Sequence, residues 1–184
     1  MTGLASRSQL RMSFLRYALV TVPAVLLLGM VSGVASNSGY ENGWFAALEK
    51  PGLMPPSWAF PVAWTILYIL LGLVLAMILH ARGAKGRGVL IALFAAQLLL
   101  NYGWSPLFFA AHQVEAALVV ILFMVALTIV LMALLRPVRP LAALLLAPYL
   151  AWLCLAAALN WQILQLNPNA SELVPQRGRT NISL

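Results

Sequence analysis

The chain has 184 residues, of which 63% are hydrophobic and only 8% are charged, and its formal net charge is +7. Soluble domains carry about 25% charged residues, so this composition excludes an ordinary water-soluble globule. All charged residues and both histidines lie outside five uncharged stretches, residues 17–35, 62–79, 89–111, 116–135 and 141–166. Roughly 20 apolar residues cross a bilayer as a helix that satisfies its own backbone. We therefore predict an all-α integral membrane protein, a bundle of five transmembrane helices.

The first stretch allows two interpretations. Arginines at positions 7, 11 and 16 precede its apolar core, and the small residues Gly33 and Ala35 follow it. This pattern is typical of a secretory signal peptide as well as of a first membrane helix. The motifs described below favour a retained helix. We expect residues 1–13 to form an N-terminal tail and residues 14–167 to form one transmembrane domain.

The basic residues are concentrated in alternate connections. Eight of the eleven lysines and arginines lie in the N-terminal segment and in the connections after the second and fourth helices, whereas Lys50, Arg177 and Arg179 lie elsewhere. The positive-inside rule then predicts a cytoplasmic N-terminus and an external C-terminus, in a bacterial inner (cell) membrane. Because topology accounts for the positive charge, we expect no nucleic-acid partner.

The connection between the first two helices, residues 36–56, is long and ends in a proline-rich run. Loops of this length are often functional lids, and proline fixes φ and removes a hydrogen-bond donor. We expect this loop to cover a pocket, and Ser57 to cap the following helix. The candidate lid and hinge residues are Pro51, Pro55, Pro56, Trp58 and Pro61. The polar segment 168–184 is predicted to be a disordered tail.

Aromatic and carboxamide side chains recur at helical spacing in the second, third and fifth helices. Each series falls on one helix face, and polar groups within a bilayer face the bundle interior or a cavity. Interfacial anchoring or bonds between helices could explain any single residue, but their convergence favours a pocket for a flat, largely apolar ligand. No carboxylate lies inside a span, and no nucleophile–histidine–acid set or metal-ligand spacing is present, so we expect no catalytic residue and no metal site.

Several motifs resemble those of the TspO/MBR family, which includes the bacterial tryptophan-rich sensory protein and the mitochondrial translocator protein (peripheral benzodiazepine receptor). The motifs are Trp44-Phe-x-x-Leu-x-Lys-Pro51, Pro55-Pro56-x-Trp-x-Phe-Pro-x-x-Trp64 with Tyr68, Asn101-x-x-Trp-Ser-Pro-Leu-Phe-Phe109, Pro148-Tyr-Leu-x-Trp152 and Leu159-Asn160. They occur in family order between about residues 20 and 167.

The resemblance implies a five-helix bundle, often dimeric, that binds porphyrins and other tetrapyrroles between its helices below the first loop. Porphyrin or haem would be a ligand, with no obligatory cofactor. The candidate ligand-binding residues are Trp44, Phe45, Lys50, Trp64, Tyr68, Asn101, Trp104, Trp152, Ala156 and Asn160. Lys50 is the one basic residue of the loop; we expect it either to pair with a porphyrin propionate or to anchor the chain at the membrane interface.

Three classes of function stay open at this point. The leading hypothesis is a membrane sensor or carrier of tetrapyrroles, and the alternative is a light-dependent porphyrin-degrading enzyme that uses clustered tryptophans. A pure interaction protein is the third. Ala92 and Ala96 form a small-xxx-small pattern that favours a homodimer interface. The family's sterol-recognition segment is altered here, with Trp161 and Gln165 in place of tyrosine and a basic residue, so we expect no sterol binding.

Overall fold

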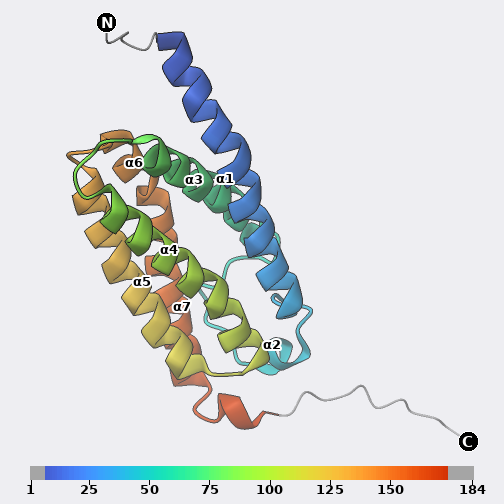
Figure 1. The fold of residues 1–184 in the computed structure, drawn as a ribbon. Helices are drawn as coiled ribbons and strands as arrows, with labels where there is room; N and C mark the ends of the chain where they lie inside the picture. The colour runs from blue at the N-terminus through green and yellow to red at the C-terminus, as the bar shows by residue number, and fades with distance from the viewer. Residues whose placement is uncertain (1–6, 174–184) are drawn as a thin grey trace, which may run out of the picture.

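The computed structural model describes residues 7–173, and every regular element in this part of the chain is a helix (Figure 1). Five helical stretches of the described chain are long and apolar enough to cross a membrane. They are α1 (Arg7–Ala35), α3 (Ala59–His80), α4 (Arg87–Ser105) with its continuation η1 (Pro106–Ala110), α5 (Val114–Leu135), and α6 (Pro140–Leu145) with α7 (Ala147–Leu166). The prediction of a five-helix membrane bundle is confirmed.

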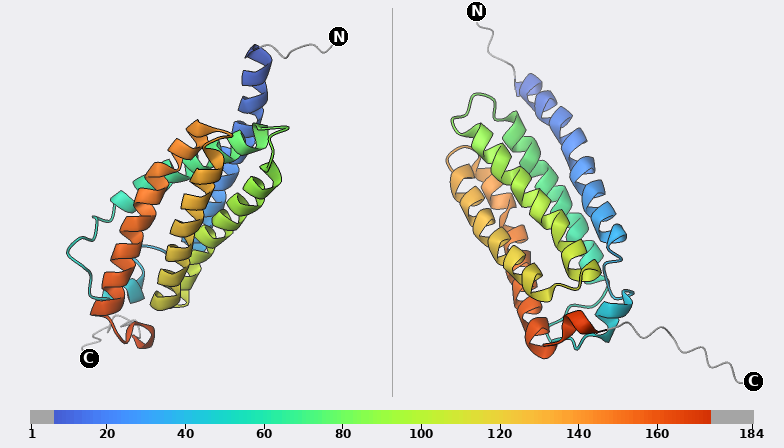
Figure 2. Two further views of the ribbon diagram at one scale, coloured as in Figure 1. Left: turned by 90° about the vertical axis from the view of Figure 1, so that its left-hand side faces the viewer. Right: turned by 60° about the horizontal axis from the view of Figure 1, so that its bottom comes forward.

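The connections divide the bundle into two ends. The α3–α4 and α5–α6 connections lie at the end from which the N-terminal part of α1 projects (Figures 1 and 2); we call this the basic end, because it contains Arg82, Arg87, Arg136 and Arg139. The opposite end, the loop end, holds α2 (Gly43–Ala47), the α4–α5 connection and the short 3₁₀ helix η2 (Ala170–Glu172). The predicted grouping of basic connections at one end is therefore correct.

Helix α1 packs along α3, while α5 packs against α4 and α7. At the α1–α3 contact the two backbones approach closely, since a Cβ atom on Gly72 would lie 2.6 Å from the Cα atom of Val22. The Thr21 hydroxyl donates a hydrogen bond of 2.7 Å to the Gly72 carbonyl. Small residues allow this kind of backbone approach between membrane helices, so Gly72 fixes where α1 crosses α3.

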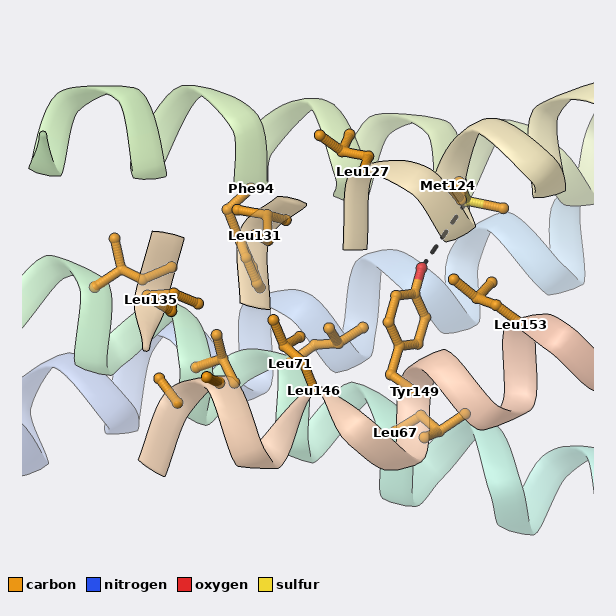
Figure 3. Close-up of a cluster of buried hydrophobic side chains, with 14 of the residues drawn as sticks. Leu67, Leu71, Phe94, Met124, Leu127, Leu131, Leu135, Leu146, Tyr149 and Leu153 are labelled. Atoms are coloured by element: carbon orange, nitrogen blue, oxygen red, sulfur yellow. Dashed lines mark hydrogen bonds between the residues drawn. The ribbon is translucent and has the colours of Figure 1, made fainter. Parts of the chain in front are cut away.

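The main core lies between α3, α4, α5 and the α6–α7 pair. Figure 3 shows leucines of these helices surrounding Phe94 and Tyr149, with the Tyr149 hydroxyl directed at the sulfur of Met124, 3.9 Å away. Both aromatic side chains are fully buried. Because lipid tails are as apolar as leucine, close packing of such faces, rather than transfer from water, holds membrane helices together.

Several helix boundaries differ from expectation. Helix α1 begins at Arg7, inside the segment expected to be a tail, because the helical pattern continues past the apolar stretch. The fifth span is interrupted at Leu146, since Pro148 has no N–H to continue the hydrogen bonding of α6. The expected Ser57 cap is wrong: Trp58 is the N-cap of α3 and makes no side-chain capping bond. Pro61 lies in the first turn of α3, where a missing N–H costs little.

The two terminal segments are described only in part. Of the expected N-terminal tail, residues 1–6 lie outside the described residues. Of the expected C-terminal tail, residues 170–172 form η2, and residues 174–184 lie outside the described residues.

Candidate functional site

The first loop, residues 36–56, is held against the bundle by buried contacts. Asn42 caps α2, its side-chain oxygen accepting from the Phe45 N–H at 2.9 Å. Trp44 is 1% exposed; its indole N–H donates to the Ala170 carbonyl at 2.7 Å, and its ring stacks on His112 with 4.3 Å between centroids. Trp44 therefore anchors the loop to the bundle.

A second attachment joins the loop to the end of α7. The Asn167 side-chain oxygen accepts from the Glu49 N–H at 2.8 Å, and its amide donates to the Glu49 carbonyl at 2.9 Å. Asn167 is also the C-cap of α7. This reciprocal pair fixes the loop just before Lys50. Sequence reasoning missed Asn167, because a single asparagine after a helix gives no signal of a long-range partner.

Lys50 is placed at the end of α2. Its ammonium donates to the carbonyls of Ala46 and Leu48, both at 3.2 Å, and lies 5.0 Å from the centroid of the Phe45 ring. Partial burial removes water from the ammonium and lowers the pKa of Lys50 below its usual value. Cations stabilise the carbonyl ends of helices, and one of the three ammonium N–H groups stays available. Contact with a propionate stays a prediction.

A continuous row of aromatic rings runs from the loop into the bundle. Each ring in the row lies within 5.1–6.2 Å, centroid to centroid, of the next ring. In order, the rings belong to Phe45, Tyr40, Phe60, Trp152, Trp64, Tyr68 and Tyr102. We call these seven residues the aromatic row. It joins four of the predicted ligand-binding residues and adds three that sequence reasoning did not select. Of these three, Phe60 belongs to the proline-rich motif given above, whereas no motif or spacing pointed to Tyr40 or Tyr102.

Tyr40 links the row to the proline-rich part of the loop. Its hydroxyl donates to the Pro55 carbonyl at 2.7 Å, and burial raises the pKa of Tyr40. Pro51 is buried, whereas Pro56, Trp58 and Pro61 are exposed. Of the candidate hinge residues, Pro51 therefore packs inside the loop, whereas these three lie on the outer surface.

An open apolar groove of about 380 Å³ lies between α3 and α7 beside the row. Its walls are formed by Ala63, Ile66, Leu67, Pro148, Ala151, Trp152 and Leu155. Trp152 belongs to both the groove and the aromatic row, and its indole is only partly buried. The groove therefore gives a flat apolar molecule access to one indole of the row from the side of the bundle.

Two buried carboxamides of α4 and the Tyr149 hydroxyl of α7 form a polar centre in the main core. The Tyr149 hydroxyl accepts hydrogen bonds from the Gln97 and Asn101 amides, at 2.9 and 3.1 Å. Asn160 lies apart from this centre, toward the loop end, where its amide donates to the carbonyl of Val114, the first residue of α5, at 2.8 Å. The side-chain oxygens of Gln97, Asn101 and Asn160 are buried and have no hydrogen-bond partner among the described residues. Unpartnered buried acceptors are costly and uncommon, so these oxygens keep unused acceptor capacity inside the bundle.

The remaining predicted residues, Trp104, Ala156, Ala92 and Ala96, lie on α4 and α7. Trp104 stacks on Phe108 at 5.0 Å and donates to the Ala117 carbonyl at 3.2 Å, so it joins the loop contacts to the main core. Ala156 is half-buried against the core on α7. On α4, Ala92 is exposed and Ala96 is half-buried.

Comparison with known proteins agrees with this architecture. A sequence profile of the TspO/MBR family matches residues 20–166. The tryptophan-rich protein TspO of Chlorobaculum tepidum is 43% identical over 127 residues, 68% of this chain and 80% of that protein. Protein CrtK of Rhodobacter capsulatus is 32% identical over 151 residues, 81% of this chain and 94% of that protein. The human translocator protein is 36% identical over 136 residues, 73% of this chain and 80% of that protein. The chain is a multi-pass membrane protein that belongs to the TspO/MBR family.

Proposed function

We propose that this protein is a membrane sensor or carrier that binds porphyrins and related tetrapyrroles between its helices, below the first loop. The observation that carries the proposal is the aromatic row, which leads from the loop to Tyr102 and borders the α3–α7 groove at Trp152. A flat macrocycle stacks on Trp152 and Trp64, each such contact contributing about 0.5–1.5 kcal/mol beyond the burial of area.

The polar centre supports the same class of ligand. A free-base porphyrin carries pyrrole N–H donors within an otherwise apolar ring, and the Gln97 and Asn101 side chains offer buried oxygens without partners. Porphyrin propionates require a cation, for which Lys50 keeps a free N–H group at the mouth of the loop. Haem, whose pyrrole nitrogens are occupied by iron, gains less from the amide oxygens.

We propose further that the protein lies in a bacterial inner membrane as a homodimer, with the N-terminus in the cytoplasm. The basic end carries eight lysines and arginines, which favours that orientation. The exposed side of α4 at Ala92 permits close contact with a second copy.

Quenching of tryptophan fluorescence by protoporphyrin, haem and a sterol tests the proposal in detergent and in the dark. We expect saturable quenching by the tetrapyrroles and none by the sterol. Trp152→Phe and Trp64→Phe should each weaken protoporphyrin binding about two- to tenfold. The matched control is Trp161→Phe, because Trp161 is 55% exposed on the outer face of α7. Equal affinities for all three variants and the unaltered protein would contradict the proposed site.

Illumination separates binding from the enzymatic alternative. The contact between Trp64 and Trp152, 6.2 Å between centroids, is the feature that would favour light-dependent degradation. A carrier or sensor leaves the Soret band of bound protoporphyrin as stable under light as that of porphyrin in detergent alone. Faster decay that is lost in Trp64→Phe and Trp152→Phe would instead support the enzyme.

A further inference from the structure

We propose that a second groove, between α1 and α3 at the basic end, binds the phosphate-bearing head group of an anionic phospholipid. This groove has a volume of about 590 Å³. Its polar lining comes from Ser13, Arg16, Tyr17, Thr21 and Arg82, and its apolar lining comes from Val20 and Leu79. It lies at the opposite end of the bundle from the first loop, so the inference is independent of tetrapyrrole binding.

The depth of the groove matches the boundary between head groups and acyl chains. Arg82 lies two residues beyond His80, the last residue of α3. Leu79 lies in the last turn of α3, and Val20, which is exposed, is one helical turn, about 6 Å, further along α1 than Arg16. The cationic rim therefore lies at the level of lipid phosphates while the floor faces hydrocarbon.

The two arginines of the rim are available to an anion. Arg16 is exposed and makes no hydrogen bond or ion pair with the residues that the structure describes. Arg82 donates from Nε and Nη2 to the Tyr17 hydroxyl, at 3.0 and 2.5 Å, and lies 5.6 Å from the centroid of that ring. Since a guanidinium has five N–H donors, Arg82 keeps donors for a phosphate, and the hydroxyl keeps its own proton to donate.

Among residues 7–173, which the structure describes, no carboxylate side chain competes with a lipid phosphate for this rim. All four acidic residues, Glu41, Glu49, Glu115 and Glu172, lie at the loop end. Unneutralised arginine pairs are suited to phosphate, which accepts short, charge-assisted hydrogen bonds. Basic pockets between membrane helices bind anionic head groups in this way. The apolar floor favours a lipid over a free phosphate ion, which would leave Val20 and Leu79 uncovered.

Competition between matched lipids tests the site. The full chain in detergent is mixed with equal amounts of phosphatidylglycerol and phosphatidylcholine of the same acyl chains, and retained lipid is counted by native mass spectrometry. We expect preferential retention of one phosphatidylglycerol per chain. Arg16→Gln should weaken this retention roughly fivefold, and it breaks no hydrogen bond or ion pair among the described residues. Arg82→Gln should act similarly, but it also removes the bonds to Tyr17, so Arg16→Gln is the decisive variant.

The matched control is Arg136→Gln, which removes the same charge from an exposed position at the same end of the bundle. It should retain the lipid as the unaltered protein does. Equal loss in Arg136→Gln would show general surface attraction, and equal retention of both lipids would show no recognition of charge. Inorganic phosphate forms the third arm: if it raises the unfolding temperature as much as phosphatidylglycerol does, the occupant is a free anion. Each of these three outcomes overturns the proposal.

Discussion

At the scale of single residues, the hydroxyl of Tyr149 is the centre of the buried polar network. It accepts from two amides on α4, one turn apart, and lies among side chains that exclude water. The network therefore ties α7 to α4 at the depth where the candidate pocket would form, and its energetics can be separated from those of the aromatic row.

Replacing Tyr149 by phenylalanine should lower the free energy of unfolding by about 1–3 kcal/mol, because the Gln97 and Asn101 amides would lose their buried acceptor. Thermal unfolding in detergent measures this loss. Adding Gln97→Leu and Asn101→Leu to the same chain should restore much of the stability, since removal of all partners of a buried hydrogen bond is nearly neutral. A triple variant less stable than Tyr149→Phe would contradict this account. Tyr40→Phe, which removes one partly buried bond to the Pro55 carbonyl, is the control for loss of a hydroxyl.

At the scale of elements, the attachment of the first loop to α7 decides how readily the loop opens. Asn167→Ala removes both bonds to the Glu49 backbone, which should raise the open population about five- to thirtyfold. Cleavage by the glutamate-specific protease Glu-C after Glu49 measures that population, provided opening is fast relative to cleavage.

The control for this experiment is Asn169→Ala, because Asn169 is exposed and its side chain caps nothing. It should leave the cleavage rate unchanged. Equal rates for Asn167→Ala and the unaltered chain would mean that the other loop contacts, including those of Trp44, hold the loop without the Asn167 bonds.

The contact between α1 and α3 gives a second prediction at this scale. Gly72→Ala would bring a Cβ atom to 2.6 Å from the Val22 backbone, and overpacking of this kind costs roughly 1–3 kcal/mol. Gly103→Ala is the matched control, since its Cβ would meet nothing within 4 Å and alanine favours the helix. We expect a lower midpoint of thermal unfolding for Gly72→Ala and an unchanged or higher one for Gly103→Ala. A Gly103→Ala loss as large as that of Gly72→Ala would show that the close approach is unimportant.

How far the sequence predicts these elements depends on the range of the interactions. Uncharged stretches predict the five spans, and helical spacing predicts that Trp64 and Trp152 lie on the aromatic faces of their helices. Both predictions depend on patterns among residues that are near in sequence. The Glu49–Asn167 attachment and the Trp44–Ala170 bond join residues more than 100 positions apart, and spacing carries no information about such pairs. The Ser57 cap failed for another reason: α3 begins at Ala59, one residue later than a cap at Ser57 requires.

At the scale of the whole molecule, charge is segregated along the bundle. Basic residues lie mostly at one end, and all four carboxylates lie at the other. The first loop, with Lys50 as its basic residue, lies at the loop end, whereas the proposed lipid groove lies at the basic end. Lysine and arginine in short connections, rather than the carboxylates, determine orientation, so the basic end should face the cytoplasm.

Cysteine labelling in intact bacterial cells tests this orientation. Cys154 is the one cysteine of the chain, and Cys154→Ala provides a background without thiols. In that background we expect Asn169→Cys, at the loop end, to react with a membrane-impermeant maleimide in intact cells. Lys85→Cys, in the α3–α4 connection, should react only after permeabilisation, because the eight basic residues at its end favour the cytoplasmic side. The reverse labelling pattern would place the first loop and its tryptophans inside the cell, and a ligand entering through that loop would then come from the cytoplasm.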